Sequence, residues 1–250
     1  DQPRSRGLGD VYKRQVWQAR EVDGALVLTH VSPDGDEGFP GTLEVRVTYS
    51  LSADGVLMLD YWAKSDADTL CNLTNHSYFN LLGHDAGTLA GQQVEIFADA
   101  ITQTDESSTP TGALLPVEGT PFDLRRPRDF LEGLAMDHPQ LALGNGYDHN
   151  FVLHTAPISP LSLAARVSGG GLVLECLTTQ PGLQLYTANY LDGTPGKGGT
   201  AYGPRSAFCL ETQNWPDAVH HASFPSPVLR AGEVYRHRTV YRVGMCPPLP

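Results

Sequence analysis

Residues 43–51 alternate between apolar and polar side chains without a break, which is the pattern of a β-strand with one buried face. The apolar set that would share this face is Leu43, Val45, Val47, Tyr49 and Leu51. The sequence Ser-Ala-Asp-Gly follows at residues 52–55 and is typical of a turn. Residues 56–62 are again suited to a strand. The stretch therefore predicts a β-hairpin.

Short apolar segments bounded by turn residues recur along the rest of the chain. They are residues 25–31, 161–167, 172–178, 183–190, 207–211 and 237–243. Only residues 129–135 have a briefly helical pattern. Many short strands without strand–helix alternation indicate an antiparallel sandwich or barrel. With no linker or internal repeat in sight, we expect one all-β domain.

The charge balance and the cysteines exclude several classes of function. The chain has 17 Lys and Arg against 28 Asp and Glu, a net charge of −11, which disfavours nucleic acids and anionic membranes as partners. No apolar run approaches the ~20 residues of a membrane-spanning helix, and the polar N-terminus lacks the apolar core of a secretory signal. The four cysteines show no paired metal spacing, and Cys176 and Cys209 are expected to be buried free thiols. A cytoplasmic location is the expectation.

Polar residues inside apolar strand sequence are the candidates for chemistry. His76 lies in Asn-Leu-Thr-Asn-His-Ser-Tyr-Phe-Asn-Leu, where an imidazole could act as acid or base or simply be a hydrogen-bonded core histidine. Asp148 enters a strand after an Asn-Gly turn, and it could equally close that turn. Glu211 ends the apolar run Phe-Cys-Leu, either as a buried carboxylate that needs a partner or as a sheet-edge Glu facing solvent. Gln184 completes the set.

These clusters together resemble the signature stretches of the aldose 1-epimerase (galactose mutarotase) family. The resemblance runs from about Val16 to about Val243. The segments that carry it are residues 32–41, 72–81, 147–151, 178–192, 209–218 and 229–235. It implies a large antiparallel β-sandwich, the mutarotase-like supersandwich, in agreement with the strand pattern.

The resemblance also implies a function and roles for single residues. Family members interconvert the α and β anomers of free hexoses such as glucose and galactose, and they need no metal or other cofactor. By position in the motifs, His76 is the general acid and Glu211 the general base, while Asp148 and Gln184 bind the sugar. His149 is left out, because neighbouring residues of a strand point to opposite faces.

One departure from the family concerns the N-terminal portion. Family members carry a site arginine in an Asn-Arg motif and a site histidine in a His-Gly-Gly motif, and neither motif occurs in this sequence. We therefore expect residues 1–15 to be a non-native or disordered leader. Residues 16–250 are expected to form a single sandwich domain that lacks the family's N-terminal strands, with open sheet edges and weak activity.

Three other functions stay open at this point. A glycosidase could use Asp148 and Glu211 as its carboxylate pair, but His76 would then have no role. A carbohydrate-binding or regulatory protein could keep the sandwich without turnover. A relative acting on hexose 6-phosphates would need a basic pocket, and no Arg/Lys cluster stands beside the motifs.

Overall fold

The computed structural model describes residues 15–154 and 161–245 and consists mainly of antiparallel β-strands. The leader expected at residues 1–15 lies, except for Gln15, outside the described residues, and so does Cys246. Across the described ranges, no helix is both long enough and apolar enough to cross a membrane.

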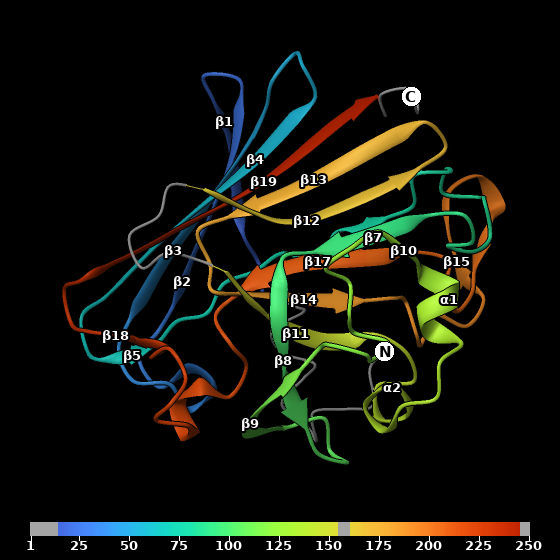
Figure 1. Cartoon of the computed structure of the whole chain (residues 1–250). Helices are drawn as coiled ribbons and strands as arrows, with labels where there is room; N and C mark the ends of the chain where they lie inside the picture. Colours follow the sequence, from blue (N-terminus) through green and yellow to red (C-terminus); the bar gives the residue numbers. More distant parts are fainter. Residues whose placement is uncertain (1–14, 155–160, 246–250) are drawn as a thin grey trace.

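Within these residues the chain forms two large sheets that pack face to face (Figure 1). The nine-stranded sheet has the order β1 (Gln18–Val22), β2 (Ala25–Ser32), β3 (Leu43–Leu51), β4 (Val56–Ser65), β19 (Val234–Met245), β13 (Leu172–Thr178), β12 (Ser162–Gly169), β7 (Gln93–Ile96) and β10 (Arg128–Asp129). The six-stranded sheet has the order β6 (Tyr78–Phe79), β17 (Phe208–Gln213), β14 (Gly182–Tyr186), β11 (Asp148–Leu153), β8 (Ala98–Thr104) and β9 (Pro110–Pro116). The predicted antiparallel sandwich is confirmed.

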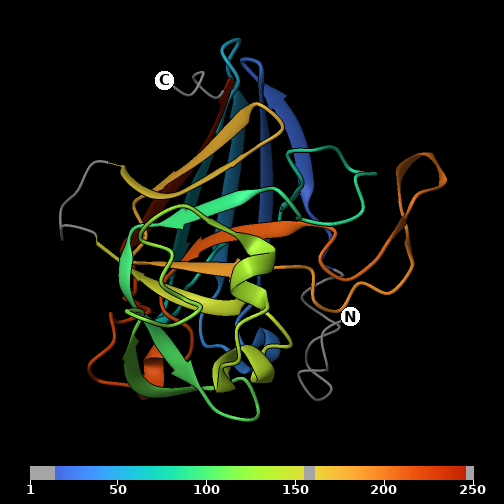
Figure 2. The same ribbon diagram turned by 45° about the vertical axis from the view of Figure 1, so that its right-hand side comes forward.

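Smaller elements complete the described chain. Two short strand pairs join β5 (Thr69–Leu70) to β18 (Val228–Leu229) and β15 (Thr194–Pro195) to β16 (Ala201–Tyr202). The loop that carries β15 and β16 projects from the body of the molecule (Figure 2). The helices are α1 (Phe130–Leu134) and α2 (Pro139–Leu143), with 3-10 turns at Asp36–Gly38, Lys197–Gly199 and Ala218–His220.

The hairpin predicted from alternation is present as β3 and β4. Val45 and Val47 are buried, whereas Glu44 and Arg46 are exposed on the opposite face. The turn is completed by Gly55 at φ +79°, a left-handed conformation that a side chain disfavours. Alternation therefore identified the strand and its buried face at Val45 and Val47, but Leu51, which was expected on that face, is exposed at the end of the strand.

One local prediction was wrong, and one helix was not predicted. The strand expected over residues 183–190 ends at Tyr186, because Ala188 takes a left-handed φ of +49° and packs with Tyr186 and Cys209 in a small apolar cluster. The apolar residues after Tyr186 therefore belong to a buried loop and not to a strand. The helix expected near 129–135 is present as α1, whereas α2, a single turn that begins at Pro139, was not predicted from the sequence.

The core lies between the two sheets and defines which face of the smaller sheet is left for a site. Phe208 contacts the rings of Phe79 and Phe130, with ring centroids 5.8 and 5.3 Å apart. Leu185 and Phe151 are fully buried on the same face. Burial of each such side chain is worth ~1.5–3 kcal/mol. Because side chains alternate along a strand, their neighbours point to the opposite face of the six-stranded sheet.

Candidate active site

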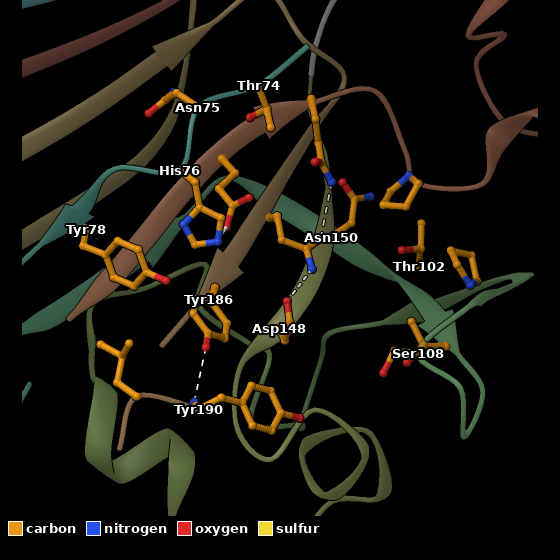
Figure 3. A pocket seen from close by; sticks show the side chains of 17 residues that line it. Thr74, Asn75, His76, Tyr78, Thr102, Ser108, Asp148, Asn150, Tyr186 and Tyr190 are labelled. Carbon is orange, nitrogen blue, oxygen red and sulfur yellow. Dashed lines mark hydrogen bonds and ion pairs between the residues drawn. The ribbon is translucent and has the colours of Figure 1, made fainter. Parts of the chain in front are cut away.

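A pocket of about 710 Å³ opens on the face of the six-stranded sheet that is turned away from the core. Its lining includes the four predicted site residues, His76, Asp148, Gln184 and Glu211. In Figure 3, His76 lies toward one side of the pocket and Ser108 toward the other. Small-molecule sites usually have volumes of ~300–1,000 Å³, so the pocket is of a size to accept a sugar.

Strand register brings three of these residues onto one face. Glu211 pairs directly with Gln184, which pairs with Asn150 on the next strand. One row further on, Asp148 pairs with Tyr186. Directly opposed residues of antiparallel strands share a face, so the two rows form a continuous polar floor.

His76 reaches this floor from the extended segment between β5 and β6. Its Nε2 lies 3.4 Å from Oε1 of Glu211. The imidazole stacks on Tyr78, with ring centroids 4.9 Å apart, and meets the edge of Tyr186 at 5.7 Å. Its side chain is 44 % exposed, so His76 is a pocket residue and the alternative of a core histidine is wrong.

A buried polar network anchors the segment that carries His76. The neighbouring Asn75 donates from Nδ2 to the hydroxyls of Tyr61 (3.2 Å) and Tyr241 (3.0 Å). The Tyr241 hydroxyl in turn donates to the carbonyl of Leu210 at 2.6 Å. Because Leu210 precedes Glu211, the network ties the backbone beside His76 to the strand that carries Glu211.

The Glu211 carboxyl is held in a setting that disfavours its charge. The residue is only 8 % exposed, so the alternative of a solvent-facing edge glutamate is wrong. Burial, with a contribution from the charge of Asp148, raises the pKa of Glu211 from 4.5 to about 8. Glu211 can therefore both accept and release a proton near neutral pH.

Asp148 and Gln184 form a hydrogen-bonded pair beside this carboxyl. The Gln184 Nε2 donates to Asp148 Oδ1 at 2.8 Å, and Gln213 Nε2 approaches Gln184 Oε1 at 3.4 Å. The amides thereby orient the Asp148 carboxylate within the pocket. A carboxylate and an amide fixed in this way can accept from and donate to the hydroxyls of a polyol.

His149 lies on the opposite face of β11, as its place beside Asp148 predicts. It is 1 % exposed and its ring centroid lies 4.6 Å from that of Phe122. Burial lowers the pKa of His149 to about 3, so the imidazole is neutral over the ordinary pH range.

Several residues of the pocket were not predicted from the sequence. Tyr186 and Asn150 lie two positions from Gln184 and from Asp148, so the period of two could have identified them. Tyr78 follows His76 by two residues in the same way. Ser108 comes from the loop between β8 and β9, and nothing in the local sequence marks it as a pocket residue.

His76, Glu211 and Cys209 place potential metal-ligand atoms within 4.8 Å of one another. However, His76 faces Glu211 through Nε2 and Cys209 through Nδ1, and these two ring nitrogens direct their lone pairs apart. One ion could not take all three as ligands in this arrangement. Burial also raises the pKa of the Cys209 thiol strongly, which disfavours the thiolate that a metal requires. The cluster is suited to holding protons rather than an ion.

A model of the aldose 1-epimerase family matches residues 8–242 of the chain. The chain belongs to the aldose 1-epimerase family. Its resemblance to this family in sequence is thereby confirmed.

Named members of the aldose 1-epimerase family match most of the chain. The galactose mutarotase of Sus scrofa is 45 % identical over 229 residues, which are 91 % of this chain and 65 % of that protein. The galactose mutarotase of Homo sapiens is 44 % identical, covering 94 % of this chain and 67 % of that protein. The crystal structure of an aldose epimerase homologue from C. elegans superimposes with a TM-score of 0.81 at 29 % identity, covering 92 % and 68 % of the two chains. The chain thus spans about two thirds of the length of these relatives.

Proposed function

We propose that this chain interconverts the α and β anomers of free aldohexoses, such as glucose and galactose, by general acid–base catalysis. His76 is the general acid and Glu211 the general base, while Asp148 and Gln184 bind the sugar hydroxyls. The observation that carries the proposal is the His76–Glu211 contact of 3.4 Å inside a pocket floored by the Asp148–Gln184 pair. Membership of the aldose 1-epimerase family supports it.

The reaction requires two proton transfers around one C–O bond. Glu211 removes the proton of the C1 hydroxyl while His76 donates its Nε2 proton to the ring oxygen, and the C1–O5 bond breaks to give the open-chain aldehyde. Rotation about C1–C2 presents the other carbonyl face to the C5 hydroxyl. On ring closure His76 takes back the proton of that hydroxyl and Glu211 returns a proton to the new C1 oxygen. These transfers need no group beyond the two side chains.

Because the roles reverse within each turnover, the two groups must have comparable proton affinities. The raised pKa of Glu211 brings its proton affinity close to that of an imidazole. The ion pair of carboxylate and imidazolium is then close in free energy to the pair of carboxylic acid and neutral imidazole. Either direction of transfer is accordingly accessible.

The pocket chemistry favours an uncharged sugar over a phosphorylated one. Tyrosines 78, 186 and 190 supply flat apolar surface beside hydrogen-bonding groups, a combination suited to a pyranose ring. Among the described residues that line the pocket there is no lysine or arginine. A hexose 6-phosphate would find no lysine or arginine in this lining to pair with its phosphate, so the free hexose is the better fit.

Polarimetry tests the proposal. Freshly dissolved α-glucose and α-galactose are followed with the purified chain, with Glu211→Gln and His76→Asn, and with the exposed Glu118→Gln as a matched control. We expect wild type and the control to accelerate mutarotation and each site variant to lose ~10²–10⁴-fold in kcat. Sugar binding without acceleration by the wild type would instead indicate a non-catalytic binding protein. Release of nitrophenol from nitrophenyl glycosides would support the glycosidase alternative.

A further inference from the structure

Cys209 lies directly beneath the imidazole of His76. Its strand neighbours in the same row are Tyr78 on β6 and Tyr186 on β14, and their rings contact the imidazole from two sides. The Cys209 Sγ is 3.4 Å from Nδ1 of His76, within hydrogen-bonding distance for sulfur. His76 is thus held at Nδ1 by a thiol and faces Glu211 at Nε2.

We infer that Cys209 is a positioning residue that accepts the Nδ1 hydrogen of His76 and thereby keeps Nε2 as the nitrogen that exchanges a proton with the sugar. The inference rests on the proposed function for its catalytic meaning. A direct chemical role is excluded by access, because Cys209 is 0 % exposed beneath the imidazole and the two tyrosines. The thiol acts through His76 alone.

The direction of this hydrogen bond follows from the proton count. A general acid at Nε2 leaves behind a neutral imidazole, and that imidazole must carry its remaining hydrogen on Nδ1. If the thiol instead donated to Nδ1, then Nε2–H would belong to a neutral imidazole, which is far too weak an acid to protonate the ring oxygen. A partner that accepts from Nδ1 keeps the productive tautomer through both halves of the reaction.

A thiol suits this position better than a stronger acceptor would. Sulfur is a weak acceptor, whereas a carboxylate against Nδ1 would stabilise the imidazolium and make its proton harder to release. Burial raises the pKa of Cys209, so the group stays a neutral thiol beside the imidazole. Among the described residues, Glu211, Tyr78 and Tyr186 are titratable groups in contact with His76. Burial raises the pKa of both tyrosines far above neutrality and that of Glu211 to about 8, so of these three groups Glu211 is the one that changes its charge near neutral pH.

The test combines NMR of 15N-labelled histidine with anomer-exchange kinetics. Long-range 1H–15N spectra distinguish protonated from unprotonated ring nitrogens, and the His76 signals are identified by their loss in His76→Gln. The variants are Cys209→Ala, which removes the acceptor, and Cys209→Ser, which restores one. Cys176→Ala is the matched control, because Cys176 is also a fully buried free thiol but lies on β13 of the other sheet.

At neutral pH we expect Nδ1 of His76 to be protonated in wild type, in Cys209→Ser and in the control. In Cys209→Ala, Nδ1 should lose its proton at a lower pH than it does in wild type. The kcat of Cys209→Ala should fall ~10-fold or more with little change in KM, and Cys209→Ser should recover most of it. An unprotonated Nδ1 in the wild type, or unchanged Nδ1 signals in Cys209→Ala, would overturn the inference. If the wild-type chain exchanges no anomers but Nδ1 still responds to Cys209→Ala, the positioning role stands and the proposed function fails.

Discussion

Glu211→Gln should stabilise the fold while it removes the proposed general base. The pKa of Glu211 is higher in the folded chain than its ordinary value of 4.5, so the folded state binds the proton more tightly than the unfolded state does. The stability of the wild type must therefore fall as pH rises from about 4.5 to about 8, where the buried carboxyl ionises. Glutamine keeps the shape of the side chain but carries no charge at any pH.

The size of this stabilisation follows from the difference between the two pKa values of Glu211. At ~1.4 kcal/mol per pH unit, the interval between 4.5 and about 8 sets a ceiling on the order of 5 kcal/mol for the gain above pH 8. Relaxation and water entry around an ionised group reduce such penalties, so we expect roughly 2–3 kcal/mol. For a chain of 250 residues this corresponds to a Tm increase of roughly 4–12 °C.

Thermal unfolding followed by circular dichroism measures this gain. Wild type, Glu211→Gln and the exposed control Glu118→Gln are compared at intervals from pH 5 to pH 9. The Tm difference between Glu211→Gln and wild type should be small at pH 5 and grow with pH, while that of the control stays flat. A Glu211→Gln difference that does not change with pH would refute the argument that burial destabilises this carboxylate.

Three further substitutions have outcomes fixed by single contacts. Tyr241→Phe removes the hydroxyl that accepts from Asn75, leaves buried polar groups unpaired, and should lower the free energy of unfolding by ~1–3 kcal/mol in urea denaturation. Gly182→Ala would place a Cβ in steric conflict with Asn150 Oδ1, and we expect a loss of ~1–3 kcal/mol by the same measurement. Asp148→Asn should raise KM and slow turnover, and because it removes a charge that raises the pKa of Glu211, the acid limb of the kcat–pH profile should move to lower pH. An unchanged unfolding midpoint in either of the first two, or an unmoved acid limb in the third, would contradict the contact concerned.

Local sequence identified β2, β3, β4, β12, β13, β17 and β19, but it placed the end of β14 too late and did not mark β7, β8 and β9. Alternation over residues 43–51 marks β3 and its inner face because the period of a strand is set by its own backbone. It could not give the order of strands in the sheets. The pairing of Tyr61 with His237, for example, depends on how the whole core packs and leaves no trace in either strand alone.

The candidate site was predictable only as a set of residues. Single motifs left His76 and Glu211 each with a structural alternative, and those alternatives are removed by exposure and burial, which depend on the assembled sheets. The contact of Cys209 with His76 was not predictable, because it joins residues far apart in the chain through strand pairing. The family's Asn-Arg and His-Gly-Gly motifs do not occur in this sequence, and the weak activity expected without them stays a prediction.

The most direct test of the central claim is whether His76 and Glu211 act as one proton-transferring pair. Exchange between the anomeric protons of glucose is measured by NMR magnetisation transfer with wild type, His76→Asn, Glu211→Gln and the double variant. We predict that each single variant loses ~10²–10⁴-fold in exchange rate. The double variant should be no slower than the less active of the two single variants, because the effects of residues that act as a unit do not add. Full exchange activity in either single variant, or a double loss equal to the product of the single losses, would contradict the account.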